Sequence, residues 1–316
     1  MKKIVYLSTD MDEAQVKCIN DNLPSGFETS FCKSADEDEK INTIHDAKYI
    51  LLSTGAITAN MINSCNNLKL IQRLGVGIDN IDLQAAKEKG IKVAIPYGIN
   101  AISVAEHTIL LMLAVCKLLP SSDKYLRKGI WDKSDVRSKG RELNEKRLGI
   151  VGLGEIGKEI AKRALAFNMD VFYYDAMKKD TDIPYMSLVD LLSECDVISV
   201  NVPKNRKTIN LINSKEIALM KEDAILINTS RGGIVNEEAL YKALESNSIL
   251  GAGIDVFEQE PICKNNPLLK LKNVVLTPHT AGINYDVMVK GIKRSLTNVI
   301  KVEEGQELSE SDIVSI

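Results

Sequence analysis

Short apolar runs alternate with longer segments in which apolar residues recur at helical spacing along most of this chain. The early runs predict strands at Lys3–Leu7, Lys48–Leu52, Leu68–Leu74 and Ile91–Ile95. The later runs predict a second series at Arg147–Val151, Asp170–Tyr174, Asp196–Asn201, Ala224–Asn228, Ile249–Ile254 and Val274–Leu276. Strands separated by helix-length segments form parallel βα units, so the pattern predicts an α/β protein with two parallel sheets.

A glycine-rich turn opens the second series. Gly152, Gly154 and Gly157 follow a strand and precede a helical segment, and Asp175 ends the next strand. In a dinucleotide-binding turn, the first glycine allows the bend, the second admits a pyrophosphate and the third lets the helix pack on the strand. Asp175 can accept both ribose hydroxyls of NAD and would repel the 2′-phosphate of NADP. We expect NAD as the cofactor; the alternative is a plain βα turn in a cofactor-free sheet.

The position of this turn indicates which half of the chain binds the cofactor and which binds the substrate. We expect residues 100–285 to form an NAD-binding Rossmann domain, and residues 1–99 plus 286–316 to form a discontinuous substrate-binding domain. The predicted architecture is thus two Rossmann-like or flavodoxin-like parallel-sheet domains with an interdomain cleft. A helix at Ala101–Leu119 is apolar on nearly every face, so we expect it to be buried between domains or against another subunit. Ser121–Arg141 is predicted to be a polar loop.

Composition narrows the class of protein. Hydrophobic residues make up 45% and charged residues 26% of the chain, as in ordinary globular proteins. A net charge of −3 gives no electrostatic reason to bind nucleic acid. The 6 cysteines include no CxxC pair, which argues against zinc and against a disulfide framework. The longest apolar stretch, Ile109–Cys116, is far shorter than a membrane span. We expect a cytoplasmic protein that binds no metal, nucleic acid or membrane.

Three residues with catalytic chemistry each follow a predicted strand. Arg231 lies in NTSRGG, Glu260 in DVFEQEP and His279 in TPHTAG. The carboxyl ends of parallel strands meet at one sheet edge, where α/β proteins bind ligands. A histidine can exchange a proton, a carboxylate can fix its tautomer, and an arginine can hold a substrate carboxylate. The two other histidines, His45 and His107, are interpreted as packing or surface residues.

Four segments together carry a family resemblance: GLGEIG with Asp175, INTSRGGIVNEEAL, GAGIDVFEQEP and LTPHTAG. They resemble the D-isomer-specific 2-hydroxyacid dehydrogenases, and the phosphoglycerate dehydrogenases are the most similar branch. The resemblance implies a homodimeric enzyme that interconverts a D-2-hydroxy acid and its 2-oxo acid with NAD, using Arg231, Glu260 and His279 as catalytic residues. Further cofactor contacts that it implies are Glu155, Ile156, Val202, Thr229, Ser230, Asp255 and His279. The substrate contacts that it implies are Arg73, Gly75, Val76, Gly77 and Arg231.

The substrate is less firmly indicated than the reaction. Arg73 matches a basic position used for substrate phosphate, but the loop Leu52–Thr58 contains no Arg or Lys. D-3-phosphoglycerate, and with it serine biosynthesis, is the leading hypothesis; the alternative is a general 2-hydroxyacid dehydrogenase or glyoxylate-hydroxypyruvate reductase. A relative acting on formate or phosphite, and an NAD-sensing corepressor-like binding protein, also stay open. Because the sequence ends at Ile316, we expect no C-terminal regulatory domain and no serine feedback.

Overall fold

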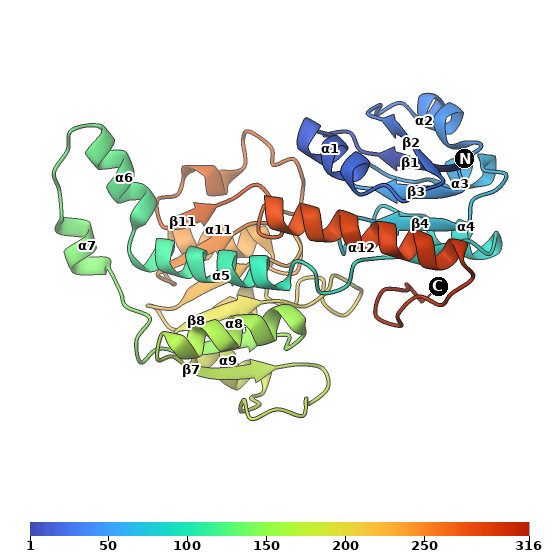
Figure 1. The fold of residues 1–316 in the computed structure, drawn as a ribbon. Coiled ribbons are helices and arrows are strands. Elements are labelled where there is room, and N and C mark those ends of the chain that lie inside the picture. Colours follow the sequence, from blue (N-terminus) through green and yellow to red (C-terminus); the bar gives the residue numbers. More distant parts are fainter. Residues whose placement is uncertain (316) are drawn as a thin grey trace. The chain divides into compact units, whose positions relative to one another are not determined.

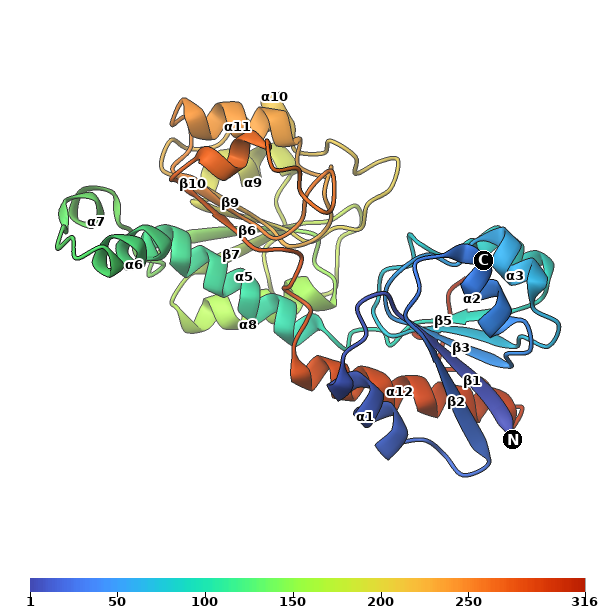
Figure 2. The same cartoon turned by 90° about the horizontal axis from the view of Figure 1, so that it is seen from above.

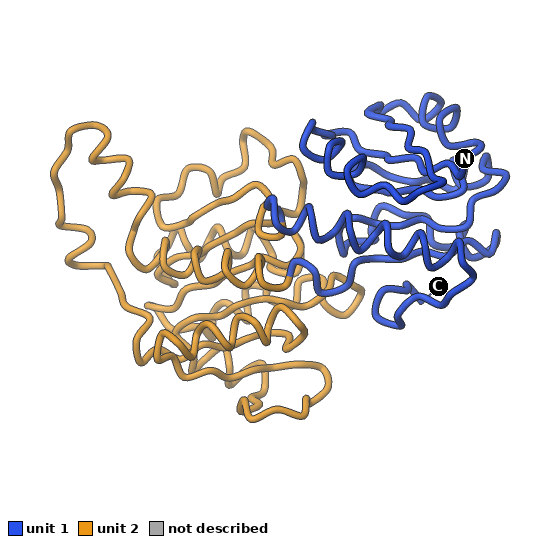
Figure 3. Tube along the Cα trace, viewed as in Figure 1, with its two compact units in different colours: residues 1–100, 283–316 blue, residues 101–282 orange. Residues whose placement is uncertain are grey.

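The computed structural model describes residues 1–315 and divides the chain into two compact units (Figure 3). Unit 1 comprises Met1–Asn100 and Ile283–Ile316, and unit 2 comprises Ala101–Gly282. The division expected from the sequence lies at 99/100 and 285/286; its last residue, Ile316, is outside the described part. Each unit contains one parallel sheet, so the predicted α/β class is confirmed.

Unit 1 has a five-stranded sheet in the order β2-β1-β3-β4-β5. Its strands are β1 (Lys2–Leu7), β2 (Phe27–Cys32), β3 (Tyr49–Leu52), β4 (Leu70–Arg73) and β5 (Lys92–Ala94). The sequence reading did not predict β2. This strand lies at the sheet edge, and only its terminal residues, Phe27 and Cys32, are buried. Its central ETSF therefore lacks the apolar run by which the other strands were recognised.

Helices cover both faces of this sheet (Figure 1). They are α1 (Glu13–Asp21), α2 (Glu37–Ile44), α3 (Ala59–Ser64), α4 (Leu83–Glu88) and α12 (Tyr285–Glu303). Alternate residues of β1 serve the two faces: Ile4 and Tyr6 pack with α1 and α12, whereas Val5 and Leu7 pack with α2, α3 and α4. The C-terminal helix thus returns to the first sheet and makes unit 1 discontinuous.

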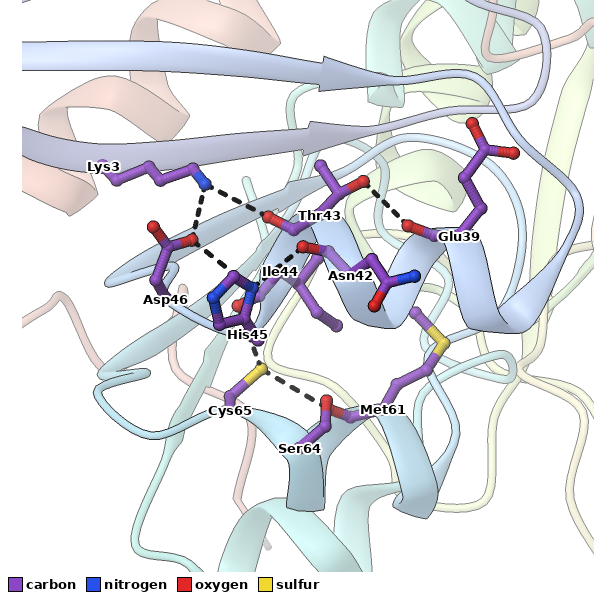
Figure 4. A network of polar contacts seen from close by, with 10 residues as sticks. All are labelled: Lys3, Glu39, Asn42, Thr43, Ile44, His45, Asp46, Met61, Ser64 and Cys65. Atoms are coloured by element: carbon purple, nitrogen blue, oxygen red, sulfur yellow. Dashed lines mark hydrogen bonds and ion pairs between the residues drawn. The ribbon is translucent and has the colours of Figure 1, made fainter.

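The end of α2 is tied to two neighbouring elements (Figure 4). Lys3 of β1 donates hydrogen bonds to the Thr43 carbonyl oxygen at 3.3 Å and to the Asp46 carboxylate at 2.5 Å. The thiol of Cys65, directly after α3, donates to the Ile44 carbonyl oxygen at 3.5 Å. These contacts satisfy orphan carbonyl groups at the helix end and fix the position of α2 on the sheet.

Unit 2 has a six-stranded sheet in the order β11-β10-β9-β8-β6-β7. Its strands are β6 (Arg147–Val151), β7 (Asp170–Tyr174), β8 (Val197–Val200), β9 (Ile225–Asn228), β10 (Gly251–Ile254) and β11 (Val274–Leu276). Successive connections run to one side of β6 and then to the other, so β6 marks the switch point of the sheet. Ligands of open α/β sheets bind at the carboxyl end of such a strand.

The helices of unit 2 correct two expectations. They are α5 (Ala101–Cys116), α6 (Leu119–Arg127), α7 (Ser134–Lys139), α8 (Glu155–Ala166), α9 (Leu188–Glu194), α10 (Ser214–Ile217) and α11 (Glu237–Glu245), with a 3₁₀ turn at Pro267–Lys270. First, most of α5 is buried against α8 and strands β9 to β11 in the core of unit 2 itself, while its Ile102 and Leu110 are 50% and 52% exposed. Second, the predicted loop Ser121–Arg141 contains α6 and α7. Pro120 lies in the first turn of α6, where proline is tolerated because the first N–H groups have no helical partner.

Neither α6 nor α7 contains a buried residue, and both project from the rest of unit 2 (Figures 1 and 2). Within residues 1–315, no single helix has the length and apolar content to cross a membrane. In this described part of the chain, one bent pair, α5 and α6 with a 63° angle between them, reaches that length and composition together.

Candidate functional site

The three residues singled out for catalytic chemistry follow neighbouring strands of unit 2. Arg231 follows β9, Glu260 follows β10 and His279 follows β11. Because these strands are adjacent and parallel, their carboxyl ends lie at the same sheet edge. The order of the strands in the sheet therefore gathers loops that are up to about fifty residues apart in sequence, as parallel α/β sheets generally do.

His279 and Glu260 form a direct pair. The Nδ1 atom of His279 lies 2.6 Å from Oε2 of Glu260. The other carboxylate oxygen of Glu260 accepts the backbone N–H of Phe257 at 2.9 Å, which holds the carboxylate in place. Both side chains remain reachable, with exposed fractions of 45% for His279 and 36% for Glu260. A carboxylate on Nδ1 leaves Nε2 as the ring atom that can exchange a proton.

Arg231 reaches the same edge through a close contact between loops. A methyl group at Gly232 would overlap the carbonyl oxygen of Phe257, so only glycine allows this approach. Asn228, at the end of β9, accepts hydrogen bonds from the N–H and the hydroxyl of Ser230 at 3.1 and 2.7 Å. Arg231 Nη1 donates to the Ser230 carbonyl oxygen at 2.7 Å. The Arg231 loop is thus built against the loop that carries Glu260.

The glycine-rich turn after β6 has the space that a dinucleotide needs. A methyl group at Gly152, which has φ +99°, would lie 2.8 Å from Val202 Cγ1, and one at Gly157 would overlap the Gly152 carbonyl oxygen. These two glycines bring the strand, turn and helix into contact. At Gly154, the N-cap of α8, a methyl group would meet no heavy atom of residues 1–315 within 4 Å beyond its chain neighbours. The space over the helix N-terminus is open, as pyrophosphate binding requires.

Asp175 lies beside this turn at the end of β7. Its Oδ2 accepts the backbone N–H of Leu153 at 3.1 Å, and Lys179 Nζ lies 3.4 Å from its Oδ1. The sheet thus places the acid next to the turn, although 22 residues separate Leu153 from Asp175 in sequence. Turn, helix and acid together fit an adenine dinucleotide. Glu155 and Ile156 begin α8, and their contacts with a cofactor stay predictions.

Two residues predicted to contact the cofactor are deeply buried. Thr229 is 7% exposed, and its hydroxyl lies 2.9 Å from that of Thr108 in α5. Asp255 is 0% exposed, and its carboxylate accepts hydrogen bonds from the loop that carries His279. Their contacts with a cofactor stay predictions. The structure adds His107, which the sequence predicts to be a packing or surface residue, as a partner of that same loop.

Most of the substrate contacts implied by the resemblance lie in unit 1, where Arg73 ends β4 and Gly75, Val76 and Gly77 follow it; Arg231 lies in unit 2. Arg73 Nε donates to the Gly77 carbonyl oxygen at 2.9 Å, and its Nη1 donates to the carbonyl oxygens of Leu52 and Ser53. Its guanidinium therefore clamps the Gly75–Gly77 turn to the loop after β3. A phosphate contact of Arg73 stays a prediction.

A cation that the sequence reading missed also lies at the loop after β3. Lys40 of α2 is only 9% exposed. Its Nζ lies 3.6 Å from the position that a Cβ atom on Gly55 would occupy. Within residues 1–315, Nζ makes no hydrogen bond and no ion pair. The local sequence of the loop, Leu52–Thr58, gave no sign of it, because Lys40 comes from the preceding helix.

Known proteins identify the class to which this fold and site belong. Residues 109–281, more than half of the chain, match the family described as D-isomer specific 2-hydroxyacid dehydrogenase, NAD binding domain. The chain belongs to the D-isomer-specific 2-hydroxyacid dehydrogenase family. It is therefore an NAD(P)-dependent dehydrogenase that acts on the CH–OH group of small 2-hydroxy acids and on the matching 2-oxo acids. The predictions of an enzyme and of a nicotinamide cofactor are confirmed.

Individual relatives divide between two activities. A hydroxypyruvate reductase of Thermotoga maritima is 45% identical over 77% of this chain and 81% of its own length. A glyoxylate reductase of Korarchaeum cryptofilum is 34% identical over 97% and 94%, respectively. A D-3-phosphoglycerate dehydrogenase of Archaeoglobus fulgidus is 41% identical over 82% of this chain, which spans only 50% of that enzyme.

A solved structure shares the whole fold. D-lactate dehydrogenase of Aquifex aeolicus, complexed with NAD and lactic acid, superposes with a TM-score of 0.86. It is 30% identical, and the superposition covers 98% of each chain.

Proposed function

We propose that this chain reduces short, unphosphorylated 2-oxo acids, hydroxypyruvate and glyoxylate foremost, to D-2-hydroxy acids with NADH. The observation that carries the proposal is the pair of His279 and Glu260 at the carboxyl edge of the unit 2 sheet, 2.6 Å apart. The reductase relatives support the choice of substrate because they match this chain over most of their own length, whereas the phosphoglycerate dehydrogenase does so over half.

The three side chains take complementary roles in this proposal. Glu260 holds Nδ1 of His279, so that Nε2 delivers a proton to the substrate oxygen on reduction and removes it on oxidation. Arg231 binds the substrate carboxylate and stabilises negative charge on the reacting oxygen. The backbone N–H groups of the Gly75–Gly77 turn are proposed as further donors to that carboxylate.

The cofactor is held by groups already in place in unit 2. We assign its pyrophosphate to the Gly152–Gly157 turn with the N-terminus of α8, and its ribose hydroxyls to Asp175. When bound, the nicotinamide supplies or accepts the hydride. The negative charge of Asp175 selects NADH over NADPH, because a 2′-phosphate would meet a like charge.

The substrate proposal is tested by initial rates of NADH oxidation with hydroxypyruvate, glyoxylate, pyruvate and 3-phosphohydroxypyruvate. We expect hydroxypyruvate and glyoxylate to give values of kcat/KM at least about tenfold above that of the phosphorylated acid, a difference of about 1.4 kcal/mol in transition-state binding. Preference for 3-phosphohydroxypyruvate would overturn the proposal. A protein that binds NADH but turns over none of these acids would act as a sensor instead.

One observation favours the second candidate, phosphoglycerate dehydrogenase activity. Lys40 is a buried lysine without an anionic partner in residues 1–315, and buried charges normally have one. A phosphate group at the Gly55 loop would provide that partner. If this activity is the true one, Lys40→Met raises KM for 3-phosphohydroxypyruvate and leaves KM for hydroxypyruvate unchanged. Lys87→Met, an exposed lysine of α4, is the matched control.

We also propose that the protein is a homodimer that associates through α6 and α7. Large apolar side chains are exposed on and between these helices: Leu119, Leu126, Ile130, Trp131 and Val136. Trp131 is the most open of them, with 77% of its surface exposed. Exposed apolar side chains gathered on one projecting segment are typical of an interaction surface. Because the same segment is present on each copy, a two-fold arrangement buries both.

A further inference from the structure

We propose that His107 of α5 is a positioning residue that holds the His279 loop in its working conformation, acting through Thr277 and Asp255. This inference rests on the proposed role of His279. His107 itself lies in a helix of the unit 2 core with only 15% of its side chain exposed, and no catalytic contact is assigned to it.

The hydrogen bonds run in one direction from His107 to Asp255. His107 Nε2 lies 3.0 Å from Thr277 Oγ1, and that hydroxyl donates to Asp255 Oδ1 at 2.6 Å. A carboxylate can only accept, and a hydroxyl has a single proton to give. The Thr277 hydroxyl therefore donates its proton to Asp255 and accepts the Nε2–H of His107. The ring is thus held in the tautomer that carries a proton on Nε2.

Asp255 in turn holds the loop on both sides of His279. Its carboxylate accepts the backbone N–H groups of Thr280 at 2.8 Å and of Ala281 at 3.0 Å. Its own carbonyl oxygen accepts the N–H of His279 at 2.8 Å. His279 has φ +55°, a left-handed conformation that costs an L-residue about 1–2 kcal/mol. Such a conformation persists only where the surroundings enforce it, and here the Asp255 contacts do so.

Helix α5 supplies two more polar contacts with the same pair of loops. Ser103, one helical turn before His107, donates to the Ala281 carbonyl oxygen at 2.8 Å. The hydroxyl of Thr108 lies 2.9 Å from that of Thr229, two residues before Arg231. In a helix that is otherwise largely apolar, these side chains all bind the loops of the proposed catalytic residues. We infer that α5 aligns His279 and Arg231 with each other.

Paired substitutions in the whole enzyme test this role. His107→Leu and Thr277→Val remove the contact, whereas His107→Gln keeps an N–H donor and Thr277→Ser keeps the hydroxyl. We expect the first two to lower kcat by about 10- to 100-fold, since small misplacements of a catalytic group have effects of this size. The dissociation constant of NADH, measured by fluorescence, should change by less than about twofold. The conservative variants should keep most of the activity.

Two further readouts separate positioning from simple destabilisation. With 4-deuterated NADH, the primary isotope effect on kcat should rise in His107→Leu and Thr277→Val, because chemistry becomes slower relative to product release. The double variant should lose no more activity than Thr277→Val alone, because both changes break the same chain of bonds. His45→Gln, an exposed histidine of unit 1, is the matched control and should behave as wild type.

The proposal fails if His107→Leu, with an unchanged melting temperature, keeps kcat within about twofold of wild type. It also fails if Thr277→Ser loses as much activity as Thr277→Val, a comparison that still decides if His107→Leu does not fold. His279→Ala distinguishes failure of the proposed function from failure of the role of His107. An active His279→Ala contradicts the proposed function; an inactive one beside a fully active His107→Leu contradicts only the role of His107.

Discussion

Two side chains of the proposed site, Glu260 and His279, are held by neighbours to which no proton transfer is assigned. Phe257 orients Glu260 through a backbone N–H, and Asp255 fixes the loop of His279. Such supporting contacts hold reacting groups in productive geometry, which is where a large share of catalytic power originates. We therefore expect the activity of the motif residues to depend on the neighbouring residues that position them.

At the residue scale, the first prediction concerns cofactor choice. Asp175→Asn keeps an oxygen for the Leu153 N–H but removes the negative charge. Lys179, now paired with Asp175 at 3.4 Å, would then be available to a 2′-phosphate. We expect the ratio of kcat/KM for NADH to that for NADPH to fall by on the order of 100-fold, because like-charge repulsion costs several kcal/mol.

Asp170→Asn, at the exposed start of the same strand, is the control for Asp175→Asn. It should leave the cofactor ratio unchanged. An Asp175→Asn enzyme that still rejects NADPH as strongly as wild type would show that another group selects the cofactor.

Candidate site residues can be proposed from the sequence where the chemistry is encoded in a short motif. GLGEIG, SRGG and TPHTAG sufficed to single out Gly154, Arg231 and His279. His107 and Lys40 could not be found in this way, because Thr277 and Gly55, the residues beside which they lie in the fold, are 170 and 15 positions away along the chain, respectively. One signal was present for His107: with Ser103, Glu106 and Thr108 it forms a polar group in a helix that is otherwise apolar.

At the scale of elements, α12 is locked to the unit 1 sheet by a cluster of charged side chains. Glu303, near its end, lies 3.0 Å from Lys2 Nζ and 2.6 Å from Lys48 Nζ, and it accepts the hydroxyl of Tyr49. The hydrogen bond from Lys48, together with those from Tyr49 and Lys2, lowers the pKa of Glu303 from 4.5 to about 2. Burial raises the pKa of Tyr49, and the Glu303 carboxylate adds to that effect.

A lowered carboxyl pKa predicts how stability depends on pH. The ionised Glu303 stabilises the fold above about pH 4.5, and this contribution is lost as pH falls toward about 2. Glu303→Gln should therefore lower the free energy of unfolding at pH 7 by about 2 kcal/mol, the scale of a charge-assisted hydrogen bond. The difference from wild type, measured by urea denaturation, should vanish near pH 2.

Glu304→Gln, the exposed neighbour, is the control and should match wild type throughout. A Glu303→Gln protein that is as stable as wild type at pH 7 would show that the pairing of Glu303 with the two lysines makes no net contribution to the free energy of unfolding.

Some helices and strands can be predicted from the sequence more readily than others. Strands β6, β7 and β11 have the predicted bounds, because each is a compact apolar run between helix-length segments. Helices α6 and α7 were missed because they have no buried face, and periodicity predicts a helix only when one side packs against a core. Strand β2 was missed for the corresponding reason at a sheet edge.

At the scale of the whole molecule, the proposed homodimer gives a direct prediction. In light scattering after size exclusion, the wild type should have twice the monomer mass of 34.9 kDa. Leu126→Glu combined with Trp131→Glu should yield monomers, because charges at a buried apolar contact remain unpaired. Val189→Glu, an equally exposed apolar position on α9, should leave the dimer intact. A wild type of 34.9 kDa would contradict the proposal.

The central claim is that this chain is a 2-oxo acid reductase whose proton exchange depends on His279. The most direct measurement compares NADH oxidation by wild type and His279→Ala with hydroxypyruvate, alongside the dissociation constant of NADH for each. We predict that kcat falls by about 10²- to 10⁴-fold while NADH affinity changes by less than about threefold. Turnover by His279→Ala at near wild-type speed would contradict the account.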